Sequence, residues 1–225
     1  MAYSWDVENH KTYNNKSGHY KFNCEYNFIL KNLIKTPRSI LDIGGGSGRF
    51  VIPLLEHCND ITVIDINEQA IEILKTRNSK IKTICSDFMT TIITESFPFI
   101  ISVEVLSYFQ DKNAFFQKVK TLLDQNGVFV FSYTNPDSWR FMLRKFWHVR
   151  KKAQAYHEVN LKELKRILAD NGFVIKEIEG MNWIPMPLTA DNALVSVFAF
   201  FEKFFHLNKW ISQSPWIMIS VKLKD

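Results

Sequence analysis

An apolar strand pattern that runs into an acid and a glycine-rich turn, Ser39 to Phe50, constrains this fold most. Such a turn lets a strand bring its backbone close to a nucleotide-like ligand. A dinucleotide-binding G-x-G-x-x-G that starts at Gly44 needs its third glycine at Arg49, and a phosphate-binding loop needs Gly-Lys at Arg49 and Phe50. The remaining pattern, D-x-G-x-G-x-G, favours a ligand with a ribose and an amino-acid tail but no phosphates.

Apolar runs typical of buried strands alternate with helical patterns over most of the chain. The first strand patterns lie at 40–43, 61–65, 81–85, 99–105 and 128–131. This alternation predicts an α/β fold: a Rossmann-like, doubly wound, mostly parallel seven-stranded sheet with helices on both faces. The last two strands are expected at 173–178 and 216–223, on one edge of the sheet. In such a sheet the glycine turn lies at the ligand-binding end of the strands.

The chain is expected to form a single domain over residues 1–225, because it shows no repeat and no linker. Residues 1–22 have no clear period, and the first helix is predicted at 23–33. The expected parts are an N-terminal helical cover (1–36), a cofactor-binding core (37–135), a basic aromatic insert or lid (136–158) and the C-terminal part of the sheet (159–225).

Composition limits the classes of protein that fit. Hydrophobic residues make up 46% and charged residues 23% of the chain, which argues against a disordered or fibrous protein. A net charge of +5 is too weak to argue for nucleic-acid binding, so no nucleic-acid partner is expected. Cys24, Cys58 and Cys85 form no C-x-x-C pair and are expected to be reduced. With no signal-peptide pattern and no span of ~20 apolar residues, we expect a cytoplasmic protein.

Several motifs together resemble the S-adenosylmethionine-binding pattern of class I methyltransferases. They are Ile40 to Gly48, Asp65 at the end of the next strand pattern, and Ser86-Asp87-Phe88. Their order and spacing agree with that family over about residues 23–180. The resemblance implies S-adenosyl-L-methionine as cofactor and S-adenosyl-L-homocysteine as product. The implied cofactor-binding residues are Asp42, Gly44, Gly45, Gly46, Gly48, Asp65, Ile66, Asp87, Phe88 and Glu104.

Each implied contact has a chemical reason. Asp42 is expected under the ammonium group of the cofactor, through water. Asp65, 21 positions after Gly44, is expected to accept hydrogen bonds from both ribose hydroxyls. Asp87 is expected to accept from the adenine amino group, with Ile66 and Phe88 on the faces of the ring. The structural alternative for each acid is a helix N-cap or a solvated turn.

The segment 103–109 falls at the tip of the fourth strand, where cofactor and acceptor would meet. It resembles the E-V-x-E-H segment of ubiquinone-type O-methyltransferases, but Ser107 and Tyr108 replace the Glu-His pair. A metal needs about three protein ligands, so no metal is predicted. Tyr108 is a candidate for the acceptor pocket, and the alternative is a packed aromatic side chain.

Methyl transfer from a sulfonium needs alignment and a dry pocket, and an oxygen or nitrogen nucleophile must also lose a proton. His157 is the first candidate for the general base and His148 the second. The segment around His157 resembles the entry to the helix before the sixth strand in small-molecule O-methyltransferases. The alternative for His157 is a hydrogen bond at the start of a helix.

Two further segments have more than one interpretation. Residues 140–152 interleave six Arg and Lys with aromatic residues, and could form a lid, a peripheral membrane contact or a plain surface helix. The helix predicted at 192–206 is more apolar than a single core-facing stripe requires. It could wall an acceptor pocket, make a dimer contact or pack in the core. The oligomeric state stays open.

The sequence therefore predicts an S-adenosylmethionine-dependent methyltransferase that acts on a hydroxyl of a small, partly apolar metabolite. The alternatives are an N-methyltransferase of a small molecule and a non-catalytic cofactor-binding interaction module. An RNA methyltransferase is a third alternative. The modest charge and the lack of a visible RNA-binding domain argue against it. The acceptor itself is not predicted.

Overall fold

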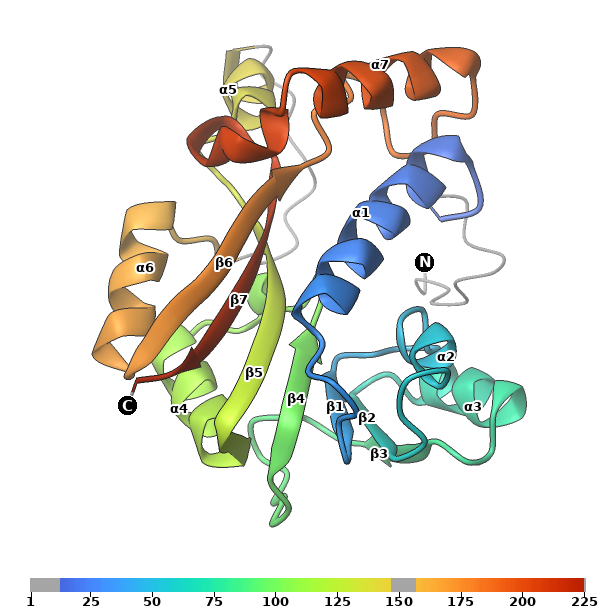
Figure 1. Ribbon diagram of the computed structural model, residues 1–225, viewed down its shortest axis with the longest axis vertical. Coiled ribbons are helices and arrows are strands. Elements are labelled where there is room, and N and C mark those ends of the chain that lie inside the picture. The colour runs from blue at the N-terminus through green and yellow to red at the C-terminus, as the bar shows by residue number, and fades with distance from the viewer. Residues whose placement is uncertain (1–12, 147–156, 225) are drawn as a thin grey trace.

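In the computed structural model, which describes residues 13–146 and 157–224, a twisted sheet forms the centre of the molecule (Figure 1). The sheet has seven strands among these residues, in the order β3-β2-β1-β4-β5-β7-β6. The first five in this order are parallel neighbours, and β7 is antiparallel to both β5 and β6. The strands are β1 (Ile40–Ile43), β2 (Ile61–Asp65), β3 (Lys82–Cys85), β4 (Phe97–Ser102), β5 (Leu123–Thr134), β6 (Phe173–Met181) and β7 (Trp216–Leu223). The predicted fold class is confirmed.

Helices cover both faces of the sheet, and a short 3-10 turn, η1 (Leu106–Tyr108), follows β4. Two more 3-10 turns, η2 (Leu207–Lys209) and η3 (Ile211–Gln213), lie before β7. In the described part of the chain, no helix has both the length and the apolar composition needed to cross a membrane. The helices are α1 (Lys16–Asn32), α2 (Val51–Leu54), α3 (Glu68–Arg77), α4 (Lys112–Leu122), α5 (Trp139–Phe146), α6 (Leu161–Asp170) and α7 (Ala193–Phe204).

The core has two layers, one on each face of the sheet. Side chains alternate along a strand, so Leu41 contributes to one layer and Ile40 to the other. Helices α4 and α6 pack on the first layer, and α1, α2 and α3 pack on the second. The central strands are buried on both faces, so their sequences are continuous apolar runs. These runs made the strands predictable from the sequence.

Two predicted elements differ from the structure at the ligand-binding end of the sheet. The first helix begins at Lys16 rather than 23, with the Asn15 side chain accepting a hydrogen bond from the Gly18 N–H at 2.9 Å. Its buried side includes polar residues such as Lys21, which is why no apolar period was visible. The fourth strand ends at Ser102 rather than 105, because Glu104 adopts a positive φ of 64° and turns the chain away.

The N-terminal helix joins the sheet to α7 (Figure 1). Its first residues bond to the segment before α7, with the Ser17 N–H donating to the Ala190 carbonyl at 3.1 Å. Its later residues Phe28 and Ile29 are buried against the sheet. Helix α1 therefore links the buried face of the sheet to the segment before α7.

The buried phenylalanine cluster under α4 should account for much of the stability of the fold. Phe116 packs edge-on against Phe115, Phe131 and Phe173, with ring centroids 5.3, 5.4 and 6.0 Å away. We expect Phe116→Ala to lower the free energy of unfolding by about 3–5 kcal/mol, because it leaves a cavity in the core. Urea denaturation followed by circular dichroism measures the change.

The matched control is Phe200→Ala on the outer side of α7, where the side chain is 61% exposed. Its expected effect is within about 0.5 kcal/mol. Equal losses from the two variants would contradict this description of the core.

Candidate functional site

A cavity of about 440 Å³ lies beyond the carboxyl ends of β1, β2, β3 and β4. Four loops line it: the glycine turn after β1, the chain after β2, the turn at 86–89, and the segment 103–110 after β4. Tyr13, which precedes α1, closes one side. This is the place where a doubly wound sheet binds its ligand.

Most of the predicted cofactor residues meet in this cavity. Asp42, Gly44, Gly45, Gly46, Asp65, Ile66, Asp87, Phe88 and Glu104 all line it. Gly48 is the exception and does not reach the cavity. A Cβ at Gly48 would collide with the Leu74 side chain, so this glycine allows α3 to pack closely.

The glycine turn is held by the neighbouring strands. Gly44 and Gly46 have φ values of +74° and +54°, in the region that favours glycine. The Gly44 N–H donates to the Ile64 carbonyl at 2.7 Å, and the Gly46 N–H donates to Asp65 Oδ2 at 2.8 Å. A Cβ on Gly44 would collide with Val105, so the turn also packs against the loop after β4.

Asp42 is a buried acid with spare hydrogen-bonding capacity. Its Oδ2 atom is buried and has no hydrogen-bond partner among the described residues. Burial raises the pKa of Asp42 to about 8, the negative charge of Asp65 adds to the rise, and Arg49 opposes it. A cation placed beside this oxygen would restore the ionised form, so the site fits the ammonium group of an amino-acid tail.

Asp65 and Asp87 also have structural roles. Asp65 accepts from the Gly46 N–H through Oδ2 and from the Asn67 N–H through Oδ1, the latter at 2.8 Å. Asp87 Oδ1 accepts from the Met89 N–H at 2.7 Å and so caps a turn. Each carboxylate oxygen has a second lone pair, so these bonds leave room for ligand hydroxyl or amino groups.

The two side chains predicted to cover a ring differ in burial. Ile66, next to Asp65, is 72% exposed. Phe88 is buried and packs edge-on against Phe109 and Phe115. Both border the cavity, so a flat ring between them would give Ile66 an apolar partner.

A cluster of charges forms the other end of the cavity, around Glu104. The Glu104 carboxylate is paired with Lys21 of α1, accepts a hydrogen bond from the Tyr13 hydroxyl at 2.9 Å and lies 3.9 Å from Arg49. Arg49 also pairs with Glu25 at 3.0 Å and lies over the Tyr13 ring. Burial lowers the pKa of Lys21 to about 8, although Glu25 favours its charged form.

Tyr13, Lys21 and Glu25 were not among the site residues predicted from the sequence. Arg49 was considered only as the residue that breaks two glycine patterns. The available signal was the i, i+4 pair Lys21 and Glu25 in a segment without apolar period. Two opposite charges one turn apart predict a helix, but they give no reason to expect that this helix face is buried.

The candidate catalytic residues are placed differently from one another. Tyr108 lies in η1, lines the cavity and is 43% exposed. His157 does not line the cavity: it borders a small separate hollow with Ser107, and its N–H donates to the Ser107 carbonyl at 2.9 Å. This backbone bond at the approach to α6 matches the structural alternative. His148 and residues 147–156 of the predicted insert lie outside the described residues, while 136–146 and 157–158 are described.

No group of three His, Cys, Asp or Glu side chains that could hold a metal is found within residues 13–146 and 157–224. Glu104, the acid that the segment shares with the E-V-x-E-H pattern, is held by Lys21 and Tyr13.

Comparison with known proteins identifies relatives of this site. The family model described as a methyltransferase domain matches residues 18–178. Nodulation protein S of Bradyrhizobium diazoefficiens is 36% identical over 76 residues, which are 32% of this chain and 36% of that protein. The matched part thus spans about a third of the relative's length.

Solved methyltransferase structures share the fold. The N-methyltransferase NodS from Bradyrhizobium japonicum, in complex with S-adenosyl-L-homocysteine, has a TM-score of 0.63 and 17% identity, covering 94% of this chain and 90% of its own. Magnesium protoporphyrin IX methyltransferase from Synechocystis, also with S-adenosyl-L-homocysteine bound, has a TM-score of 0.66 and 14% identity, with 92% and 84% coverage.

Asp65 should matter for ligand binding. We expect Asp65→Ala to weaken binding of S-adenosyl-L-homocysteine by about 10- to 100-fold, because hydrogen bonds to a carboxylate contribute about 1.5–3 kcal/mol. Isothermal titration calorimetry measures the affinity. Asp60→Ala is the control, since Asp60 pairs with Lys82 at 2.9 Å on the surface and does not line the cavity. Unchanged affinity in Asp65→Ala would contradict the assignment.

Binding should also depend on pH through Asp42. Below about pH 8 free Asp42 carries a proton, and an ammonium group beside it would displace that proton. The affinity for S-adenosyl-L-homocysteine should therefore rise with pH between about 6 and 8, by up to tenfold per unit. Calorimetry in buffers of different ionisation enthalpy should show proton release on binding.

Asp42→Asn removes the titrating group, so both the slope with pH and the proton release should disappear in this variant. Wild-type affinity that stays constant from about pH 6 to 8 would show that Asp42 does not face the ammonium group.

Proposed function

The chain belongs to the class I S-adenosylmethionine-dependent methyltransferases, and we propose that it methylates an amino nitrogen of a small molecule. The donor is S-adenosyl-L-methionine, as in its relatives. One observation carries the choice of acceptor: the described acceptor end of the cavity holds the acid Glu104 and no histidine.

The donor is proposed to occupy the part of the cavity lined by the glycine turn and the three acids. Asp42 would hold the ammonium group, Asp65 the ribose hydroxyls and Asp87 the adenine amino group. The sulfonium, which carries the methyl group to be transferred, would then face the loop after β4. Glu104 and Tyr108 lie on that loop and border the same cavity.

The nucleophile decides which protein groups are needed. A neutral amine already has a free lone pair and loses its proton after the methyl group has moved. An alkyl hydroxyl must be deprotonated during attack, so it needs a base whose pKa is suitable. The described cavity offers Glu104, which is tied to Lys21 and suits an N–H group better than an alcohol. The structural similarity to an N-methyltransferase is consistent with this choice.

A hydroxyl acceptor, which the sequence favoured, is the second candidate. The aromatic residues Tyr13, Tyr108 and Phe109 line the cavity and favour a flat acceptor. A phenol has a pKa of about 10, so it loses its proton to a weaker base than an alkyl alcohol requires. A phenolic hydroxyl is therefore the form of O-methylation that this cavity supports best.

The test is transfer of a labelled methyl group from S-adenosyl-L-methionine to a panel of small amines, each paired with the alcohol and the phenol of the same size. We expect labelled product from amines and none from the matched alcohols. Product from phenols alone would replace the proposal by its second candidate. Tight binding of the donor without transfer to any member would favour the non-catalytic module.

Glu104 should affect turnover more than donor binding. We expect Glu104→Gln to lower kcat by about 100-fold, because the carboxylate would hold the amine N–H so that its lone pair faces the methyl group, and a misplacement of about 1 Å can cost that much. The affinity for S-adenosyl-L-homocysteine should change less than tenfold. Steady-state kinetics and calorimetry separate the two effects, with the exposed Glu56→Gln as control.

Removing Glu104 leaves Lys21 buried without its partner, which can destabilise the fold. The double variant Lys21→Met/Glu104→Gln removes both charges and tests for this effect. If the double variant regains both stability and turnover, Glu104 has a structural role only.

A further inference from the structure

Helix α7 carries apolar side chains on its outer side, where a helix of this length usually carries polar ones. Together with a tryptophan in the chain that follows, they form what we call the aromatic face. Each of these side chains is between 43% and 64% exposed. The aromatic face consists of Leu194, Val197, Phe200, Phe201, Phe204, Phe205 and Trp210.

The aromatic face is fixed outward by the opposite side of the helix. Val195 and Glu202 are the buried residues of α7. The Glu202 carboxylate accepts from the Asn182 and Trp183 N–H groups, each at 3.0 Å. Because this buried acid bonds to the end of β6, α7 cannot rotate its phenylalanines inward without leaving the carboxylate unpaired.

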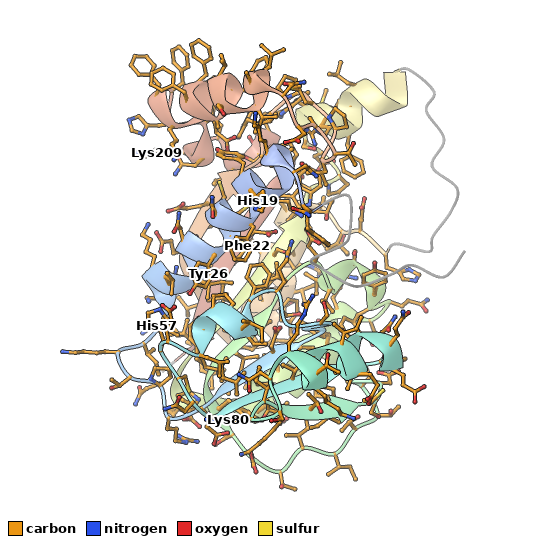
Figure 2. The ribbon with its side chains drawn as sticks, turned by 90° about the vertical axis from the view of Figure 1, so that its right-hand side faces the viewer. His19, Phe22, Tyr26, His57, Lys80 and Lys209 are labelled. Atoms are coloured by element: carbon orange, nitrogen blue, oxygen red, sulfur yellow. The ribbon has the colours of Figure 1, made fainter. Side chains whose placement is uncertain are left out.

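The exposed rings form ordered stacks along the helix. Phe200 stacks on Phe204 with ring centroids 5.8 Å apart, and Phe201 stacks on Phe205 at 6.0 Å. In Figure 2, aromatic rings project from α7 at one end of the molecule, while Lys80 lies near the opposite end. In Figure 1, α7 lies across this end with α5 beside it. A helix in this position can lie flat on a surface.

Positive charge surrounds the aromatic face. Within residues 192–213 the exposed charged side chains are Lys203 and Lys209, and the only acid is the buried Glu202. Figure 2 shows Lys209 beside α7. The exposed Asp191 lies before α7, where it accepts from the Lys16 N–H.

The charge distinguishes a membrane from a second copy of the chain. A symmetric dimer through the aromatic face would place Lys203 and Lys209 of both copies in one interface, where residues 192–213 hold no exposed acid to pair with them. Anionic phospholipid headgroups would pair with these lysines, while the acyl-chain boundary accepts the phenylalanines. Tryptophan, as at Trp210, is enriched at that boundary.

We propose that the aromatic face docks on an anionic phospholipid membrane, with α7 lying in the plane of the headgroups. The contact is peripheral, because α7 is only 12 residues long. It does not depend on the identity of the methyl acceptor. A membrane contact was one interpretation of residues 140–152, and the contact proposed here is centred on α7 instead.

Sedimentation of the full chain with lipid vesicles tests the proposal. The two probes are vesicles of phosphatidylcholine alone and of phosphatidylcholine mixed with phosphatidylglycerol. We expect binding to the mixed vesicles and at least several-fold weaker binding to the neutral ones. Phe200→Ser/Phe204→Ser should abolish binding to both, and Lys203→Glu/Lys209→Glu should weaken binding to the mixed vesicles alone.

Matched controls lie elsewhere on the surface. Ile92→Ser removes an apolar side chain that is 90% exposed, and Lys80→Glu changes a charge near the opposite end of the molecule. Both should bind vesicles like the wild type. Calorimetry with S-adenosyl-L-homocysteine shows that every variant keeps its folded site.

Absence of wild-type binding to mixed vesicles would overturn the proposal. Equal losses in the control and face variants would do the same. Light scattering after size-exclusion chromatography measures the oligomeric state and so tests whether a second copy occupies the face. If the wild type is a dimer that does not bind vesicles, and Phe200→Ser/Phe204→Ser converts it to a monomer, the face belongs to a dimer interface.

Discussion

The glycine turn after β1 is the constraint on which the site depends. Its N–H groups bond to the end of β2, and its missing Cβ atoms let Val105 pack against it from the loop after β4. Three strand ends are therefore fixed relative to one another by backbone contacts of one short segment. A side chain at Gly44 would separate β1 from the loop that carries Glu104, so donor and acceptor ends would lose their alignment together.

The elements that the sequence predicted well are those whose environment is uniform. The central strands are buried on both faces, so continuous apolar runs mark them in the sequence. Most of the predicted cofactor residues border one cavity because their spacing follows from this frame. The start of α1 was missed because its buried side is polar. Lys21 is buried against Glu104, which lies 83 positions later in the chain, as well as against Glu25.

Long-range contacts also decide which phenylalanines are buried, and for this reason the sequence pattern alone does not predict their burial. Phe116 and Phe200 both lie in apolar helical patterns, yet one is fully buried and the other is 61% exposed. The difference arises from Glu202, whose long-range bonds to Asn182 and Trp183 decide which side of α7 faces the protein. A helical period shows which residues share one side of a helix. Whether that side is buried depends on the tertiary structure that packs against it.

The charge balance around Glu104 constrains the acceptor further. Lys21 and Arg49 face Glu25 and Glu104, so two cations meet two anions in a buried cluster. A charged acceptor would upset this balance in a medium where unpaired charge is costly. A neutral amine would not, and transfer from a sulfonium turns it into a cation as the donor loses its charge. The total charge of the cavity then stays constant while the methyl group moves. The paired side chains therefore do not need to rearrange during transfer.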